Sequence, residues 1–424
     1  MKLAVVGGGS TYTPELVAGL ARERERIDLD ELVLHDIDPE RREIVGGLAE
    51  RMLAAAGYAG RLEVTDDLDR ALDGASFVLV QLRVGGQAAR LIDETVPLAC
   101  GCIGQETTGA GGLAKALRTV PVVLEIAARA RELADDNAWI VDFTNPVGIV
   151  TRALRDGGHR AVGLCNVAIG VQRLIARLLD VEPARLLVDQ VGLNHLTWVR
   201  AVRLDGRDVL PELLAGHGDA LAEQAGQPRE VLEQLGAIPS YYLRYFYFHD
   251  EVLAQQRDGV PRAQTVAEIE RELLQLYRDP SLTTKPKLLE QRGGAYYSEA
   301  ATQLVASLST GDGDLQVVDV RNEGAVDGLA ADDVVELPAR IERQGPVPLR
   351  QPPLAPELLG LVQHVASYER LAAGAATSGD PTLVHKALLA HPLIGQVPQA
   401  DELVELLLTT GADYLPQFQR GALA

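Results

Sequence analysis

Apolar and polar positions alternate in a regular rhythm over the first 170 residues. Short apolar runs rich in β-branched residues occur at KLAVV (2–6), ELVLHD (31–36), LEVT (62–65), FVLVQL (77–82), WIVDFT (139–144) and AVGLC (161–165). Helical periodicity fills the longer segments PELVAGLARER (14–24), ERREIVGGLAERMLAAA (40–56) and TVPVVLEIAARARELA (119–134). Strands that alternate with helices of this length predict βαβ units and a parallel sheet covered on both faces. The predicted fold class is therefore α/β, with a Rossmann-type doubly wound sheet.

The rhythm changes after residue 170. DQVGLNHLTWVRAVRL (189–204), followed by DGR and DVL, predicts a β-hairpin with its turn at Asp205-Gly206. Longer helices are expected around 262–278 and 354–373 and near the C-terminus, and the Pro-rich stretch 344–357 is expected to connect two of them. We predict a nucleotide-binding domain over residues 1–170 and an α+β, mostly helical domain over 171–424. That the second domain carries substrate, metal and oligomer contacts is implied by the family resemblance given below.

Composition and charge limit the classes of molecule that the chain is expected to bind. It has 424 residues, 47% of them hydrophobic, and a formal net charge of -20. That charge argues against nucleic acid or an anionic membrane surface, but a local basic pocket could still bind an anionic small substrate. There is no signal-peptide pattern and no apolar run near the roughly 18 residues of a membrane span. With three cysteines (Cys100, Cys102 and Cys165) a disulfide framework is not expected, so we predict a cytoplasmic protein with reduced thiols.

The stretch VVGGGSTYTPEL (5–16) follows the first predicted strand and resembles a dinucleotide-binding turn. Gly7 would permit the tight turn and Gly9 would let the backbone approach a pyrophosphate, whereas Tyr12 stands where G-x-G-x-x-G has its third glycine. Ser10 and Thr11 complete the predicted phosphate-binding loop, and either Ser10 or Thr13 is expected to cap the helix that follows.

Asp36 ends the second predicted strand and suits the ribose hydroxyls. A carboxylate there would repel a 2′-phosphate, which favours NAD over NADP. The alternative is a glycine-rich turn in an α/β protein that binds no nucleotide. The strand rhythm together with Asp36 favours a nucleotide.

Polar side chains follow the later strands, where open α/β sheets bind ligands. Asn145 lies in DFTNP, Cys165 and Asn166 lie in GLCN, and His195 lies in GLNH of the predicted hairpin. Thiolate and imidazole together suit a borderline divalent metal. The separation of Cys165 and His195 matches no standard zinc spacing, so a buried structural cysteine and histidine remain the alternative.

Two further segments are candidates for the site. A loop is expected from Arg83 to Arg118, where glycine and polar residues are frequent. Its GQETTGAGG part (104–112) is typical of backbone that approaches a ligand, with a long surface loop of no function as the alternative. IPSYYLRYFYF (238–248) concentrates aromatic residues that should mostly pack in a core. A tyrosine near a metal or cation could act as a base because positive charge lowers its pKa.

These motifs occur together, in order, in one enzyme family. GGGSTYTPEL, QLRVGG, IGQETTGAGG, DFTNP, GLCN, GLNH and PSYYLRYFY, with RGGAYYSEAA (292–301) and DVRNEGAVDGL (319–329), cover nearly the whole chain. The sequence resembles glycoside hydrolase family 4, and within it the 6-phospho-β-glucosidase type. The resemblance implies an NAD- and divalent-metal-dependent hydrolase, commonly using manganese, that acts on a phosphorylated glycoside and forms a homodimer or homotetramer.

The resemblance also implies residue roles. It makes Cys165 and His195 the metal ligands and Tyr242 the catalytic base, although Tyr241 beside it leaves open which ring is the base. Glu106 would lie near the base and tune its basicity. Asn166, where the α-type relatives carry Asp, points to the β-type. The resemblance implies that substrate and phosphate are bound by Arg90, Asn145, Asn166 and Arg262. Without the resemblance, we would interpret Arg262 as a surface charge at the start of a helix.

The implied mechanism is an oxidation that is later reversed. Bound NAD takes a hydride from C3 of the sugar, the resulting ketone acidifies the C2 proton, and Tyr242 removes it while the metal stabilises the enediolate. The aglycone leaves by elimination, water adds, and the hydride returns, so no pair of catalytic carboxylates is needed. The alternatives are a family 4 glycosidase for another anionic or an unphosphorylated glycoside, a net NAD-dependent dehydrogenase, and a non-catalytic NAD-binding regulator.

Overall fold

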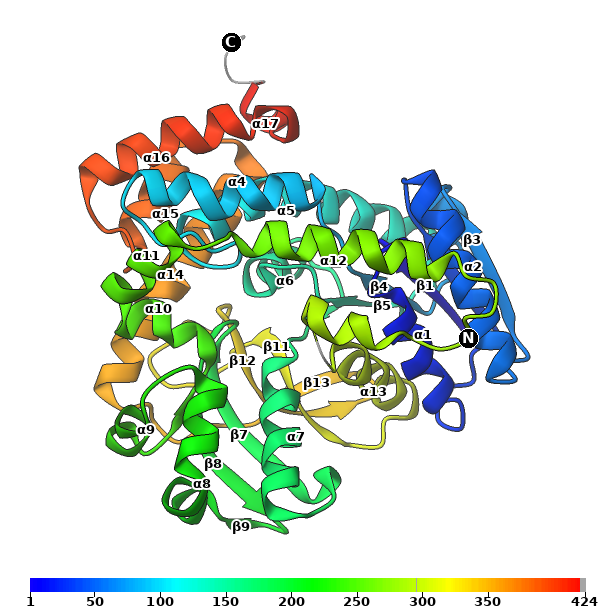
Figure 1. Ribbon diagram of the computed structural model, residues 1–424, viewed down its shortest axis with the longest axis horizontal. Helices are drawn as coiled ribbons and strands as arrows, with labels where there is room; N and C mark the ends of the chain where they lie inside the picture. The colour runs from blue at the N-terminus through cyan, green and yellow to red at the C-terminus, as the bar shows by residue number, and fades with distance from the viewer. Residues whose placement is uncertain (295, 420–424) are drawn as a thin grey trace.

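The computed structural model describes residues 1–294 and 296–419. A single mixed sheet of 13 strands runs through it in the order β10-β8-β7-β12-β11-β6-β5-β4-β1-β2-β3, with β13 added to β12 and β9 to β8. Figure 1 shows the N-terminal strands on one side of the molecule and β7, β8 and β9 at its lower end, with helices packed against both parts.

The N-terminal half is a parallel Rossmann sheet, as the sequence predicts. Its strands are β1 (Lys2–Val6), β2 (Glu31–His35), β3 (Arg61–Thr65), β4 (Phe77–Val80), β5 (Trp139–Asp142) and β6 (Ala161–Gly163). All five pairings in the order β3-β2-β1-β4-β5-β6 are parallel. The central strands are buried on both faces, which explains their continuous apolar runs.

Helices connect these strands on both faces of the sheet. They are α1 (Thr13–Arg22), α2 (Pro39–Ala55), α3 (Leu68–Leu72), α4 (Gly86–Ala99), α5 (Gly109–Leu133), α6 (Val147–Asp156) and α7 (Val167–Leu179). Helix α2 begins where the Asp38 carboxylate accepts a hydrogen bond from the amide of Arg41, at 3.0 Å. The prediction that Ser10 or Thr13 caps α1 is wrong, because the N-cap is Tyr12 and no side chain caps it.

The segment from Arg83 to Arg118 is not a long loop, which corrects the sequence-based expectation. Helices α4 and α5 occupy most of it, and the connection between them is short. Two of its glycines allow close contact between backbone segments. A Cβ at Gly104 would lie 1.9 Å from the Glu94 carbonyl oxygen, and a Cβ at Gly111 would lie 2.3 Å from the Asp93 carbonyl oxygen. Close packing of α4 against this connection therefore accounts for these two glycines.

The predicted hairpin exists, but its main turn lies elsewhere. Strands β7 (Leu186–Leu193) and β8 (Leu196–Leu204) are antiparallel and joined by the two residues Asn194 and His195. The expected turn at Asp205-Gly206 is also present and leads only into the short β9 (Arg207–Asp208). The sequence reading missed the turn that carries His195, because Asn-His is a weak turn signal.

The rest of the C-terminal half is mostly helical, as predicted. Its helices are α8 (Leu210–Ala225), α9 (Arg229–Leu235), η2 (Tyr241–Leu243), α10 (Arg244–Tyr247), α11 (His249–Asp258), α12 (Arg262–Tyr277), η3 (Lys287–Arg292), α13 (Tyr297–Thr310), α14 (Pro356–Ser378), α15 (Pro381–Ala390), α16 (Val397–Thr410), η4 (Ala412–Tyr414) and α17 (Pro416–Gln419). Its remaining strands are β10 (Ile238–Pro239), β11 (Leu315–Arg321), β12 (Val334–Glu342) and β13 (Gly345–Pro348). Strand β13 lies inside the stretch predicted to be only a connector, and its pairing with β12 corrects that prediction.

The two halves share one sheet and pack closely. Strand β11 joins β6 through the pair Asp319 and Gly163, and β12 joins β7 through Glu336 and Gly192. Helix α12 packs against α4 and α2 of the first half, and Figure 1 shows it crossing in front of the Rossmann strands. The division at residues 170 and 171 stays a prediction. No described helix is long and apolar enough to cross a membrane.

Candidate active site

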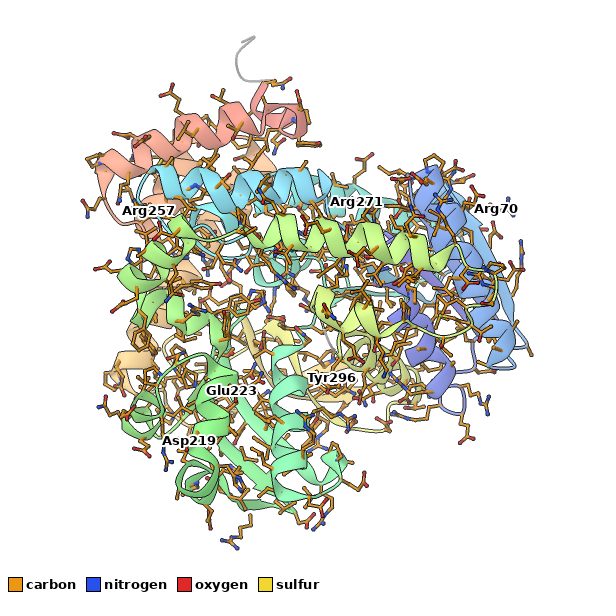
Figure 2. The ribbon with its side chains drawn as sticks, in the orientation of Figure 1. Arg70, Asp219, Glu223, Arg257, Arg271 and Tyr296 are labelled. Atoms are coloured by element: carbon orange, nitrogen blue, oxygen red, sulfur yellow. The ribbon has the colours of Figure 1, made fainter. Side chains whose placement is uncertain are left out.

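A cavity of about 1390 Å³ opens at the carboxyl ends of the parallel strands. Its walls include the turn after β1, the end of β2, the loops after β4, β5 and β6, and residues of η2, α12 and η3 from the second half. Arg70, Asp219 and Glu223, labelled in Figure 2, are exposed and do not belong to the cavity wall.

The turn after β1 has the geometry expected for dinucleotide binding. The amides of Gly7 and Gly8 both donate to the His35 carbonyl, and Gly7 has φ +92°. The Gly9 amide donates to Oδ2 of Asp36 at 2.8 Å, and a Cβ at Gly9 would lie 2.8 Å from that carboxylate. Because only glycine fits at this place, the turn leaves the backbone bare beside Asp36, which suits a bound nucleotide.

Among the other residues of this turn, some line the cavity and some are buried in the protein interior. Ser10 lines the cavity, and its hydroxyl accepts a hydrogen bond from the Tyr12 amide. Thr11 is fully buried, and its hydroxyl donates to Glu270 at 3.3 Å, so the structure turns its side chain away from the predicted role. The Tyr12 hydroxyl donates to the Gly294 carbonyl, so the residue that replaces the third glycine ties the turn to the segment after η3.

The second predicted group of residues comes together at the other end of the cavity. Tyr242 lines the cavity, and its ring stacks on that of His195 with centroids 3.8 Å apart and an interplanar angle of 16°. The Tyr297 hydroxyl lies 3.8 Å from Sγ of Cys165. Tyr241 is 43% exposed, and its hydroxyl accepts a hydrogen bond from Arg244. Of the two adjacent tyrosines, Tyr242 therefore lies on His195, whereas Tyr241 is the more exposed residue of the cavity wall. Tyr297 is a further tyrosine of the same wall and lies beside Cys165.

The donor set around Cys165 and His195 fits a soft or borderline cation. Burial, and then the charge of Lys115, lowers the pKa of His195 to about 3, so the imidazole is neutral as a ligand must be. Its Nδ1 is buried without a hydrogen-bond partner among the described residues. Burial raises the pKa of the Cys165 thiol, so a bound cation would be needed to hold the thiolate. No three His, Cys, Asp or Glu side chains in the described chain converge on a metal, so the remaining ligands would come from substrate or water.

Glu106 lies within a cluster of positive charge that the sequence did not reveal. Its carboxylate is bound by Arg83, by Nζ of Lys115 at 2.7 Å and by Nε of Arg90 at 3.2 Å. Burial opposes ionisation, but the three cations hold the pKa of Glu106 well below its usual range. Burial, and then Arg83, lowers the pKa of Lys115 to about 7.

The predicted substrate-binding residues all line the cavity but differ in their contacts. Arg90 is shared between Glu106 and Glu94. Oδ1 of Asn145 is buried with no partner among the described residues, which leaves an acceptor for a ligand hydroxyl. Arg262 is exposed at the start of α12 and donates to the carbonyls of residues 291 and 292.

Asn166 follows Cys165 at the start of α7, and its Oδ1 lies 3.9 Å from the Cys165 thiol. It therefore lies beside the candidate metal ligand as well as in the cavity wall.

Several residues of the site were not found from the sequence. Glu270 of α12 accepts hydrogen bonds from Arg41 and Arg292, and it thereby joins the nucleotide turn to the second half. Burial opposes its ionisation, but Arg292 and Arg41 lower the pKa of Glu270. Lys115 and Glu270 lie in ordinary helical sequence, where no local pattern marks a buried ion pair. The motif RGGAYYSEAA, which contains Arg292, was the one available signal.

In this fold one cavity is lined by a nucleotide turn, by Tyr242, which stacks on His195, and by Tyr297, which contacts Cys165; this arrangement is typical of a nucleotide-dependent enzyme. The chain matches the sequence profiles "Family 4 glycosyl hydrolase" over residues 2–181 and "Family 4 glycosyl hydrolase C-terminal domain" over residues 190–394. It therefore belongs to glycoside hydrolase family 4 and is a glycoside hydrolase.

Individual relatives agree with this assignment. The chain is 42% identical to a probable 6-phospho-beta-glucosidase of Bacillus subtilis, with 99% of this chain and 98% of the relative covered. A structure of the 6-phospho-beta-glucosidase of Thermotoga maritima with manganese, NAD+ and glucose-6-phosphate superposes with a TM-score of 0.91 at 34% identity, over 98% of this chain and 99% of the other. A phospho-alpha-glucosidase of Clostridium acetobutylicum is 28% identical over 97% of this chain and 98% of its own length. Malate dehydrogenase of Plasmodium falciparum, at 14% identity and a TM-score of 0.53, shares the fold and covers 89% of this chain and 99% of its own.

Proposed function

We propose that this enzyme hydrolyses 6-phospho-β-glucosides with NAD and a divalent cation, manganese being the first candidate. The observation that carries the proposal is a single cavity lined both by the Gly7–Gly9 turn with Asp36 and by Tyr242 on its His195 stack. The β-type is supported by Asn166 after Cys165 and by the higher identity to the 6-phospho-beta-glucosidase of Bacillus subtilis than to the phospho-alpha-glucosidase of Clostridium acetobutylicum.

Residues of this chain supply binding sites for both cofactors. Gly7, Gly9 and Ser10 would face the pyrophosphate and Asp36 the ribose, while Cys165 and His195 would hold the cation. Thr11 belongs to the proposed loop only through its backbone, because its side chain is buried against Glu270. When bound, NAD would supply the reversible transfer of the C3 hydride, and the cation would supply Lewis acidity beside the sugar.

Tyr242 is the proposed base. Once C3 is a ketone, the C2 proton is acidic enough for the Tyr242 oxygen to remove it. Elimination then breaks the bond from C1 to the aglycone oxygen, which takes up a proton and leaves as the alcohol. Water gives its hydroxyl to C1 and its proton replaces the one that the alcohol took, while the proton held by Tyr242 returns to C2. Burial, and then Cys165, raises the pKa of Tyr242 well above its usual value, so positive charge at Cys165 and His195 is required to make this hydroxyl a base.

The substrate would be held between the two centres. Asn145 offers its unpartnered oxygen to a sugar hydroxyl, and Asn166 lies beside Cys165. Arg90 and Arg262 are the proposed phosphate contacts, since a guanidinium can donate two parallel hydrogen bonds to a phosphate. Glu106 is held in place by its three cations and would place a constant negative charge near Tyr242. This charge raises the pKa of Tyr242, so that the ionised tyrosine is a stronger base.

A panel of 4-nitrophenyl glycosides, with and without a 6-phosphate, tests the proposal. We expect nitrophenol release from the β-glucoside 6-phosphate only when NAD+, Mn²⁺ and a reductant are present, with no net NADH. Stoichiometric NADH would instead indicate a dehydrogenase. Turnover of an unphosphorylated or other anionic glycoside alone would keep the family but overturn the proposed substrate, and no turnover of any glycoside would favour a regulator.

Cytoplasmic location and a homodimer or homotetramer remain predictions. Cell fractionation and light scattering would test them.

A further inference from the structure

The turn that carries His195 is held in an unusual backbone conformation. Asn194 and His195 are the only residues between the paired positions Leu193 and Leu196. His195 has φ +66°, which lies in the left-handed region that a residue with a Cβ enters at a cost. The surrounding structure must therefore stabilise this turn.

The imidazole does not hold its own orientation through a hydrogen bond. Nδ1 of His195 is buried and has no partner among the described residues. The ring is placed instead by its stacking on Tyr242 and by the backbone of the turn.

Glu336 on β12 is bonded to this turn through Asn194, and the Ser240 hydroxyl donates to the His195 carbonyl at 3.5 Å. Glu336 is 1% exposed, its Oε2 accepts a hydrogen bond from Nδ2 of Asn194 at 2.8 Å, and its Oε1 accepts one from Gln190. Both oxygens of one buried carboxylate thus bind the hairpin, one on strand β7 and one at its tip. Strands β12 and β7 also pair directly through Glu336 and Gly192, so the side-chain bonds add to a close contact between the two strands.

We infer that Glu336 is a positioning residue for His195, and that it acts through Asn194 to set the metal affinity of the site. This inference rests on the proposed function, because it assumes that His195 binds the cation. Removing one acceptor would leave a buried amide donor unpaired and free the turn to relax toward ordinary backbone angles. Loss of a residue that supports a metal ligand typically weakens metal binding by about 10- to 100-fold.

Titration of Mn²⁺ into the NAD-loaded protein, followed by electron paramagnetic resonance, tests the inference. Glu336→Gln and Asn194→Ala should each raise the Kd for Mn²⁺ by about tenfold or more. The double variant should lose hardly more than the worse single variant, because both changes remove the same contact. Additive losses, or single variants within about twofold of the wild type, would overturn the inference.

Two controls separate the possible failures. Glu15→Gln changes another buried carboxyl, on α1 and paired with Lys285, and should leave Mn²⁺ affinity unchanged; an equal loss there would show a general effect of the buried carboxyls and overturn the specific role. Melting temperature and NAD+ affinity check that each variant is folded. If Cys165→Ser also binds Mn²⁺ normally, the proposed metal site itself is wrong, whereas a loss in Cys165→Ser alone overturns only the role of Glu336.

Discussion

The two ends of the cavity are built in different ways. The nucleotide end is a single tight turn plus the end of the adjacent strand, and its hydrogen bonds come mainly from backbone amides of residues 7–9. The metal end collects side chains from the loop after β6, the tip of the β7–β8 hairpin, the η2 turn and the connection before α5. The nucleotide end is formed by residues that are close together in the sequence. The metal end forms only when distant segments pack together.

Because of this difference, the two ends should be sensitive to different kinds of substitution. A backbone site depends on the absence of side-chain atoms, so substitutions that add volume should harm it. A site made of side chains on several elements depends on their identity and on the buried groups that support them, such as Glu106 and Glu336. Substitutions at one end should therefore leave binding at the other end largely unchanged.

Loss of the proposed base should give the largest effect. Tyr242→Phe should lower kcat roughly a thousandfold, because no other described hydroxyl stacks on His195, while affinity for NAD+ stays near the wild-type value. Steady-state kinetics and fluorescence titration of NAD+ measure the two quantities. Tyr241→Phe is the matched control and should stay within about threefold. The reverse ranking of the two variants would move the base to Tyr241.

Loss of a proposed metal ligand should come next. Cys165→Ser should weaken Mn²⁺ binding about 100-fold, because an alcohol is a far poorer anionic ligand than a thiol, and NAD+ binding should persist. Calorimetric titration with Mn²⁺ measures this effect. Cys102→Ser, at a buried thiol of the first half, provides the comparison. A normal metal requirement in Cys165→Ser would remove this residue from the site.

A change at the nucleotide end should show the opposite pattern. In Gly9→Ala the added Cβ would meet the Asp36 carboxylate at 2.8 Å, and overpacking of this kind costs about 1–3 kcal/mol. We therefore expect NAD+ affinity to fall about tenfold or more, with Mn²⁺ affinity little changed. Gly47→Ala on α2, where the nearest atom is the end of the Arg51 side chain at 3.4 Å, is the control. Equal loss of both ligands in Gly9→Ala would show that the two ends are not independent.

The stability of the protein should depend on pH through His391, a buried histidine that contacts the segment next to Glu106. The Gly109 amide donates to Nε2 of His391, next to the segment that carries Glu106. Burial, and then His364, lowers the pKa of His391 to about 3 from the 6.5 that is usual for histidine. The unfolded chain therefore takes up a proton that the folded chain does not, and stability is lost as the pH falls through about 6.5 toward 3.

The size of this effect can be measured against a variant. Between about pH 7.5 and 6 the His391 contribution should fall by about 1 kcal/mol. Chemical denaturation at several pH values should show a shallower pH slope in His391→Gln than in the wild type. An unchanged slope would mean that His391 does not titrate in this way.

Local sequence was a good guide to the first half and to the nucleotide end. The strands of the Rossmann sheet, Gly7, Gly9 and Asp36 follow from patterns that extend over a few residues. The same reasoning failed for the segment between Arg83 and Arg118, where glycines needed for helix packing looked like a loop. It also missed the Asn194–His195 turn, whose conformation depends on Glu336, a residue far along the chain.

By itself the sequence determined the α/β class, the nucleotide turn and, through motifs spread over the whole chain, the enzyme family. These features depend on periodicity, on glycine geometry and on residue identity, all of which are written along the chain. Only the tertiary structure decided that Tyr242 rather than Tyr241 lies on His195, that three cations surround Glu106, and that Thr11 turns inward to Glu270. The reason is physical: burial and charge pairing depend on groups brought together from distant segments, and no local pattern records which groups these will be.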